Sequence, residues 1–105
     1  MTDKEEIKDG LLEQFYDNGQ LKHRVNHKDG KLDGLWELFY ENGQLMMKTY
    51  YKNDELDGLF EEFRWNGLLK VRQHHKNGKK DGLQEEFYGN GKPKSRMNYK
   101  NGKED

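Results

Sequence analysis

Short runs of alternating apolar and polar residues recur along the chain between pairs that contain glycine. Asp-Gly pairs begin at residues 9, 33, 57 and 81, and cutting there gives four gapless units of 24 residues. Within each unit, two alternating runs flank an Asn-Gly pair, which is a strong local signal for a β-hairpin. The chain has no Ala, and no apolar stripe with the helical period survives between the glycines. The pattern therefore predicts an all-β fold.

Residues 9–105 are expected to form one repeat domain, with units 9–32, 33–56, 57–80 and 81–104. Counted from the Asp at position 1, strands should lie at roughly positions 3–8 and 13–19 of each unit. This predicts a single-layer, elongated antiparallel meander of four tandem β-hairpin repeats, with about eight strands. Residues 1–8 do not align with the repeat and are expected to form a tail or a short cap. Pro93 replaces Leu at position 13, which indicates that the last strand is an edge.

Two turns per unit are expected to be two-residue type I′ turns, at positions 10–11 and 21–22. Such turns place position p opposite position 21 − p, so Glu at position 5 should face a basic residue at position 16. Across the second turn, the same rule places position 14 of the preceding unit beside the next Glu. The result would be a ladder of alternating charge whose basic residues at position 16 are Arg24, Lys48, Arg72 and Arg96.

Strand parity assigns positions 3, 5, 7, 14, 16 and 18 to one face, and positions 4, 6, 8, 13, 15, 17 and 19 to the other. The first face is nearly the same in every unit, which suits residues that stack repeat on repeat. On the second face, and at the first-turn tips, side chains typical of interface centres collect. In one interpretation Trp36, Tyr40 and Phe60 only pack together to shield the sheet. In the other, the following residues contact a partner: Trp36, Tyr40, Met47, Tyr51, Phe60, Trp65 and Leu68.

Composition narrows the classes of function. The chain has 19 Lys and Arg, 20 Asp and Glu, 12 Gly and no Cys. The two signs of charge are interspersed, so we expect no nucleic-acid partner. Without Cys there are no disulfides or thiolate zinc sites, and the four His and the neighbouring carboxylates do not converge, so we expect no metal site, cofactor or catalysis. No stretch has a targeting or membrane-spanning pattern, which predicts a cytoplasmic protein.

The segment DGLWELFYENGQL at residues 33–45, followed by a strand ending YYKNDEL and another Asp-Gly, resembles the MORN-repeat variant found in tandem in many bacterial proteins. It is similar to the YwqK-type antitoxin family, which is built from such repeats. The resemblance covers residues 9–104. The departures are Arg64 in place of an aromatic residue, Asn53-Asp54 at a turn, and Pro93. The resemblance implies a single-layer sheet of hairpins. It also implies a protein-binding or immunity role, in which contact neutralises a toxin.

We therefore expect a non-enzymatic protein-binding repeat module that acts as an antitoxin. Other MORN repeats are associated with membrane attachment, phosphoinositide lipids and scaffolding. The alternative is thus a structural or membrane-surface scaffold that binds anionic lipid. A sheet with two open edges would also permit an edge-to-edge homodimer.

Overall fold

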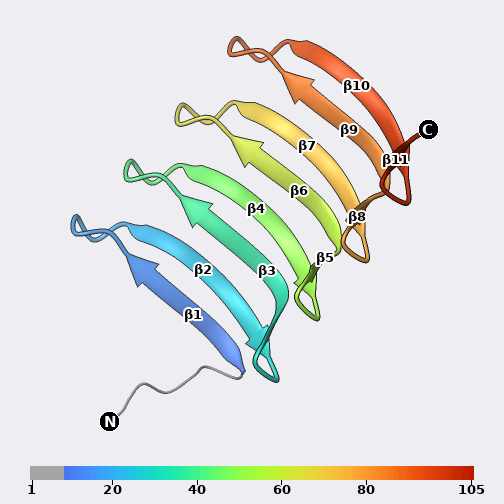
Figure 1. Ribbon diagram of the computed structural model, residues 1–105. Helices are drawn as coiled ribbons and strands as arrows, with labels where there is room; N and C mark the ends of the chain where they lie inside the picture. Colours follow the sequence, from blue (N-terminus) through green and yellow to red (C-terminus); the bar gives the residue numbers. More distant parts are fainter. Residues whose placement is uncertain (1–8) are drawn as a thin grey trace.

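The computed structural model describes residues 9–105, which form an open antiparallel sheet whose hairpins follow one another in sequence order (Figure 1). This part of the chain contains no helix, and so none that could cross a membrane. The long strands are β1 (Gly10–Phe15), β2 (Leu21–Lys28), β3 (Lys31–Phe39), β4 (Leu45–Lys52), β6 (Gly58–Phe63), β7 (Leu69–Lys76), β9 (Gly82–Phe87) and β10 (Pro93–Lys100).

The predicted class, an antiparallel single-layer meander of hairpins, is confirmed. The sheet has eleven strands, because three second turns extend into the two-residue strands β5 (Glu55–Leu56), β8 (Lys79–Lys80) and β11 (Lys103–Glu104). The expected tail or cap at residues 1–8 lies outside the described residues.

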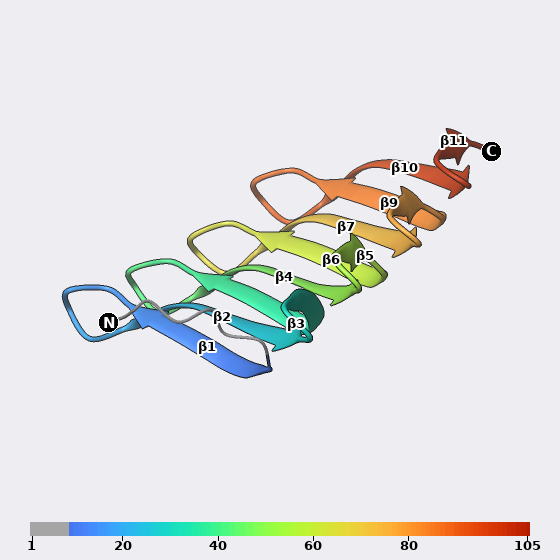
Figure 2. The same ribbon diagram turned by 60° about the horizontal axis from the view of Figure 1, so that its bottom comes forward.

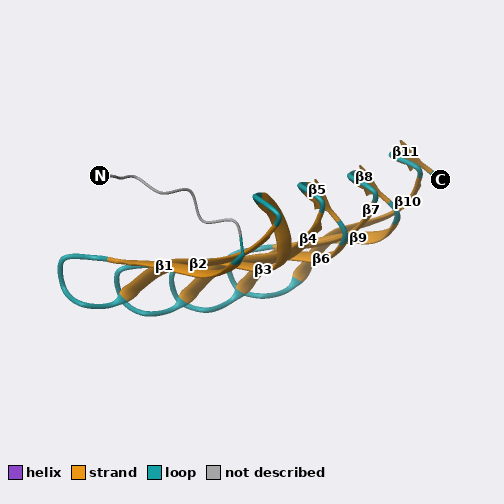
Figure 3. Cartoon of the chain, turned by 90° about the horizontal axis from the view of Figure 1, so that it is seen from below, coloured by secondary structure: helices purple, strands orange, loops and turns teal. Residues whose placement is uncertain are grey.

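Residues 9–105 form a single layer, as Figures 2 and 3 show, and no second layer of this part of the chain covers the sheet. The extents are 50 × 33 × 13 Å. Among residues 9–105, the residues that are almost fully buried are Val25, Thr49 and Gln84. A thick apolar core therefore does not hold the hairpins together.

The second turns have the predicted conformation. Asp29 and Gly30 have φ values of 54° and 79°, and Lys28 pairs directly with Lys31 around them. Both central residues of a type I′ turn require positive φ. Asn53 and Asp54 meet this requirement without a glycine, at 52° and 70°, because Asn and Asp tolerate the left-handed region.

The first turns were predicted incorrectly. In the first hairpin, the Gly19 N–H donates to the Tyr16 carbonyl and the Tyr16 N–H donates to the Gln20 carbonyl, at 2.9 and 2.8 Å. This is a three-residue loop in which Gly19, at φ 87°, takes the left-handed conformation. Asn18 contributes through its side chain, whose Oδ1 accepts from the Gln20 N–H at 2.9 Å.

Because of this loop, the predicted pairing of the two strands within the hairpin holds up to Gln14 and fails next to the turn. Gln14 faces His23 as expected, but the next pair is Phe15 with Leu21, so Lys22 is skipped. Skipping one residue reverses the side on which side chains emerge. Position 13 therefore shares the face of the Phe at position 7, and position 14 moves to the other face. The predicted faces of these two positions were wrong.

The register between hairpins also differs from the prediction. Arg24 at position 16, and not Lys22 at position 14, faces Glu37 of the next unit. The cause is a bulge at the Asp-Gly pair, where residues 33–35 lie between two ladder pairs that only Asn26 separates on β2. Gly34 has a φ of 101° there, a value that glycine adopts readily.

The two bulges align the charged residues in one row across the sheet. Arg24 lies between two carboxylates, with Nε 3.0 Å from Glu13 Oε2 and Nη1 3.4 Å from Glu37 Oε1. The predicted Glu–base pairs within the hairpins are confirmed, and the bases also face the Glu of the next hairpin. In ladder order the row is Glu13, Arg24, Glu37, Lys48, Glu61, Arg72, Glu85 and Arg96.

Hydrogen bonds at the tips add a second link between hairpins. The Tyr16 hydroxyl donates to the Phe39 carbonyl at 2.6 Å, and the Tyr40 hydroxyl donates to the Phe63 carbonyl at 2.7 Å. Arg64 stands where these tyrosines stand, and its Nη2 donates to the Phe87 carbonyl at 3.0 Å. The departure at Arg64 therefore preserves the link.

The first turn yields a test with a matched control. A Cβ added to Gly19 or to Gly89 meets no atom within 4 Å, but only Gly19 has a positive φ, of 87°. We expect Gly19→Ala to lower the free energy of unfolding by about 1 kcal/mol, because an L-residue is strained there. Gly89→Ala should leave stability unchanged or raise it slightly. Urea denaturation of both variants measures the difference, and equal effects would contradict this turn geometry.

Candidate binding surface

The seven residues predicted to contact a partner fall into two places. Trp36 on β3, Met47 and Tyr51 on β4, and Phe60 on β6 lie within the strands. Trp65 and Leu68 lie in the first turn of the third hairpin, which we call the third tip (residues 64–68). Tyr40 belongs to the preceding tip. The structure therefore does not gather all seven into one site.

The aromatic residues of the strands pack against neighbours in the sheet. The Trp36 and Tyr51 rings pack edge to face, with 5.5 Å between their centres. The Phe60 and His75 rings also pack edge to face, with 6.1 Å between their centres. Thr49, directly opposite Trp36 in the ladder, is 1% exposed. Burial also raises the pKa of the Tyr51 hydroxyl. These contacts fit the interpretation that Trp36 and Phe60 shield the sheet.

The second turns bend toward this same face. Figure 3 shows β5, β8 and β11 rising from one side of the sheet. The Lys80 Nζ of β8 lies 4.8 Å from the centre of the Tyr99 ring on β10, at the position that corresponds to Tyr51 and His75. The face is therefore concave at one end, and its aromatic residues are partly covered.

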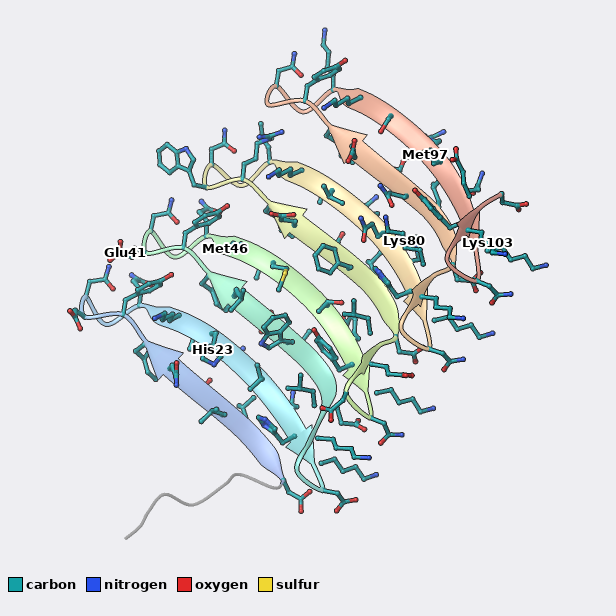
Figure 4. All side chains as sticks on the ribbon, viewed as in Figure 1. His23, Glu41, Met46, Lys80, Met97 and Lys103 are labelled. Carbon is teal, nitrogen blue, oxygen red and sulfur yellow. The ribbon has the colours of Figure 1, made fainter. Side chains whose placement is uncertain are left out.

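The third tip differs from the others. Trp65 is 68% exposed and Leu68 is 39% exposed. At the position of Trp65 the other tips carry Asp17, Glu41 and Gly89. Figure 4 shows Glu41 at the end of the sheet that the tips form. A large apolar side chain thus points into solvent where other hairpins carry a carboxylate or no side chain.

A hollow of about 400 Å³ lies beside Trp65. Gly89, the one glycine outside the repeating pattern, opens it on the side of the fourth hairpin, because it has no side chain there. A smaller hollow shares Arg64 and Lys70 with it and also includes Lys94. The residues that line the larger hollow are Tyr40, Arg64, Trp65, Asn66, Lys70 and Gly89.

Two of the residues that line the hollow, Arg64 and Lys70, are cations, and none is a carboxylate. Arg64 donates to the Phe87 carbonyl through Nη2, and its buried Nε has no hydrogen-bond partner among the described residues. Lys70 Nζ is 3.8 Å from a Glu62 oxygen and remains half exposed. A group with an apolar body and a carboxylate could therefore contact both Trp65 and these cations.

Sequence reasoning missed Arg64 and Lys70 as members of this surface. Arg64 was visible only as a departure from an aromatic position. Lys70 was assigned to the opposite face, because the bulge after the first turn was not foreseen. Lys70 lies close to Glu62, which is at position 6 on the second of the two faces, and this contact shows that Lys70 lies on the same face.

The opposite rim, formed by the second turns, carries exposed lysines. Figure 4 shows Lys80 and Lys103 at this end of the sheet. A hollow of about 540 Å³ here also includes the carboxylates Glu55 and Asp81. The exposed lysines at positions 20 and 23 are Lys28, Lys31, Lys52, Lys76, Lys79, Lys100 and Lys103.

Side chains suited to hold a metal do not gather anywhere in residues 9–105, where no three His, Asp or Glu residues are grouped for it.

The environment of His75 predicts a pH dependence of stability. Burial lowers the pKa of His75, and the positive charges of Lys80 and His74 lower it further. The unfolded chain therefore takes up a proton at a higher pH than the folded chain does. Stability should fall as pH decreases through the ordinary histidine pKa, and level off below the folded value. Urea denaturation from neutral to mildly acidic pH should show a smaller decline for His75→Gln than for the native chain. Identical profiles would contradict the prediction.

Comparison with known proteins identifies the repeat. A family model described as the MORN repeat variant matches residues 8–29, 32–53 and 80–101. No curated protein and no solved structure matches the chain. The third hairpin lies outside the matched ranges, yet its strands and turns repeat those of its neighbours. MORN repeats generally form non-catalytic binding modules. Because the matches cover more than half of the sequence, the chain belongs to the MORN repeat variant family.

Proposed function

We propose that this protein is a non-enzymatic repeat module that binds another protein through its third tip. The observation that carries the proposal is the exposure of Trp65, at 68%, beside the partly exposed Leu68. Trp is the residue most often found at the energetic centre of protein interfaces. The repeat does not require it, because the other hairpins form the same turn with Asp17, Glu41 or Gly89.

The surroundings of Trp65 favour a partner segment with an apolar side chain next to a carboxylate. The hollow would receive the apolar group, while Arg64 and Lys70 on its wall would attract the negative charge. The tips of the first two hairpins carry Asp17 and Glu41 instead. Repulsion by these carboxylates would direct an acidic partner to the third tip.

The partner that we propose is a toxin, which binding would neutralise by direct contact in the cytoplasm. The support for this role is the resemblance of the repeats to those of YwqK-type antitoxins. The interspersed charges of the sheet support the absence of a nucleic-acid partner.

The two apolar residues of the third tip can be replaced by their equivalents in the second tip, which forms the same turn. Trp65→Glu with Leu68→Gln recreates the residues found at Glu41 and Gln44. We expect the folded double variant to bind the partner at least about 30-fold more weakly, since a central Trp contributes roughly 2 kcal/mol or more. Co-purification from native cells with the wild-type chain supplies the partner, and titration calorimetry measures the affinity.

Asp17→Glu, a change at the first tip, is the matched control and should bind like the wild-type chain. Unchanged affinity of the double variant would remove the third tip from the interface. It would return attention to the concave face, where Trp36→Ala is the corresponding variant.

A second candidate function is that of a scaffold on an anionic membrane surface. The exposed lysines along the second-turn rim favour it, although Glu55 and Asp81 interrupt them. This function predicts that the protein co-sediments with vesicles containing anionic lipid, and that salt weakens the binding. Lys76→Gln with Lys100→Gln should reduce such binding, whereas the third-tip variant should not. Absence of vesicle binding at low salt would exclude the scaffold.

A further inference from the structure

The three junctions between hairpins are built in the same way. The second strand of one hairpin pairs with the first strand of the next, as β2 with β3, β4 with β6 and β7 with β9. At each junction a base at position 16 faces the Glu at position 5. A side chain at position 8 donates to the next position-7 carbonyl. At two of them an Asn at position 10 also donates to the next position-9 carbonyl, at 3.0 and 2.9 Å.

The last hairpin carries the donor half of a further junction. Within residues 9–105 the only ion pair of Arg96 is with Glu85, at 3.0 Å, and its side chain is 68% exposed. Arg24 and Arg72, which each lie between two carboxylates, are 38% and 40% exposed. Tyr88 occupies position 8 and is 52% exposed. Within residues 9–105 its hydroxyl has no neighbouring hairpin to which it could donate.

The first hairpin carries the acceptor half. Among the described strands, β1 pairs with β2 alone. Among the described residues, Glu13 forms an ion pair only with Arg24, whereas Glu85 forms ion pairs with both Arg72 and Arg96. Phe15 is 58% exposed, while its equivalents in the later hairpins are partly buried.

Pro93 does not prevent pairing at the β10 edge. The ladders at the internal junctions begin at position 15, with His23 opposite Leu38, Met47 opposite Glu62 and Val71 opposite Glu86. Position 13, where Pro93 lies, takes no part in them. The short strand β11 covers only the Tyr99–Lys100 end of β10. At an internal junction β4 pairs with the short strand β5 and with β6 at the same time, so a short strand of this kind does not block pairing with a further hairpin.

We propose that copies of this chain associate head to tail, with the β10 edge of one copy pairing with the β1 edge of the next. Arg96 would then face Glu13 of the second copy, and the Tyr88 hydroxyl would donate to the carbonyl of its Phe15. Pairing of like edges in register would instead oppose Glu13 to Glu13 or Arg96 to Arg96, which is unfavourable. The two edges are different surfaces, so each added copy leaves one free edge of each kind and the assembly extends beyond a dimer.

Charge reversal at each edge tests the arrangement. In sedimentation velocity at low salt, the wild-type chain should grow in mass with concentration beyond a dimer. Glu13→Lys removes one edge and Arg96→Glu removes the other, so each variant alone should stay monomeric. In an equimolar mixture, the intact β10 edge of Glu13→Lys meets the intact β1 edge of Arg96→Glu. The two reversed edges also carry opposite charges and can pair, so growth in mass beyond a dimer should return.

Glu41→Lys, a reversal away from both edges, should associate like the wild-type chain. Circular dichroism confirms that the variants fold, and the milder pair Glu13→Gln and Arg96→Gln should weaken association if a reversal prevents folding. The third-tip variant should also associate normally, which separates this proposal from the proposed function. A wild-type chain that stays monomeric at all concentrations would overturn the proposal. Variants that associate alone, or a mixture that does not associate, would do the same.

Discussion

The rest of the structure depends on the pairing of each hairpin with the next. An isolated two-stranded hairpin is marginally stable in water, and residues 9–105 provide no second layer against which the hairpins could pack. Only Val25, Thr49 and Gln84 are nearly fully buried among the described residues. The junction therefore has to supply the stability that a core supplies elsewhere. It does so with a backbone ladder, a row of alternating charge and hydrogen bonds between the tips.

This dependence explains which residues are free to serve a function. Positions 5, 8 and 16 are committed to the junction, and even the unusual Arg64 keeps the bond that the tyrosines make. Position 9 is not committed through its side chain, because only its carbonyl takes part. Trp65 lies at this free position. At one end of the sheet the last hairpin presents the donors of a junction, and at the other end the first hairpin presents the acceptors. The proposed association of copies rests on these two unpaired edges.

Much of the fold could be predicted because the repeat places strong local signals at fixed intervals. Glycine and Asn spacing located both turns, and alternation located the ends of the long strands to within one or two residues, except that β3 begins four residues earlier than predicted. The Glu–base pairs within each hairpin followed from their distance to the turn. The candidate surface was predicted less well. Trp65 and Leu68 stood out by comparison between units, but Arg64 and Lys70 depended on which way their strands face.

The sequence alone determined the hairpin units, the antiparallel order and the type I′ second turns, because these follow from the preferences of short segments. Only the tertiary structure decided the register at the tips and between hairpins. Asn-Gly is compatible with both a two-residue turn and the three-residue loop that forms, and Asp-Gly is compatible with both a regular strand and the bulge at Gly34. The pairing of whole hairpins selects the register that places each base of the first three hairpins between two Glu residues.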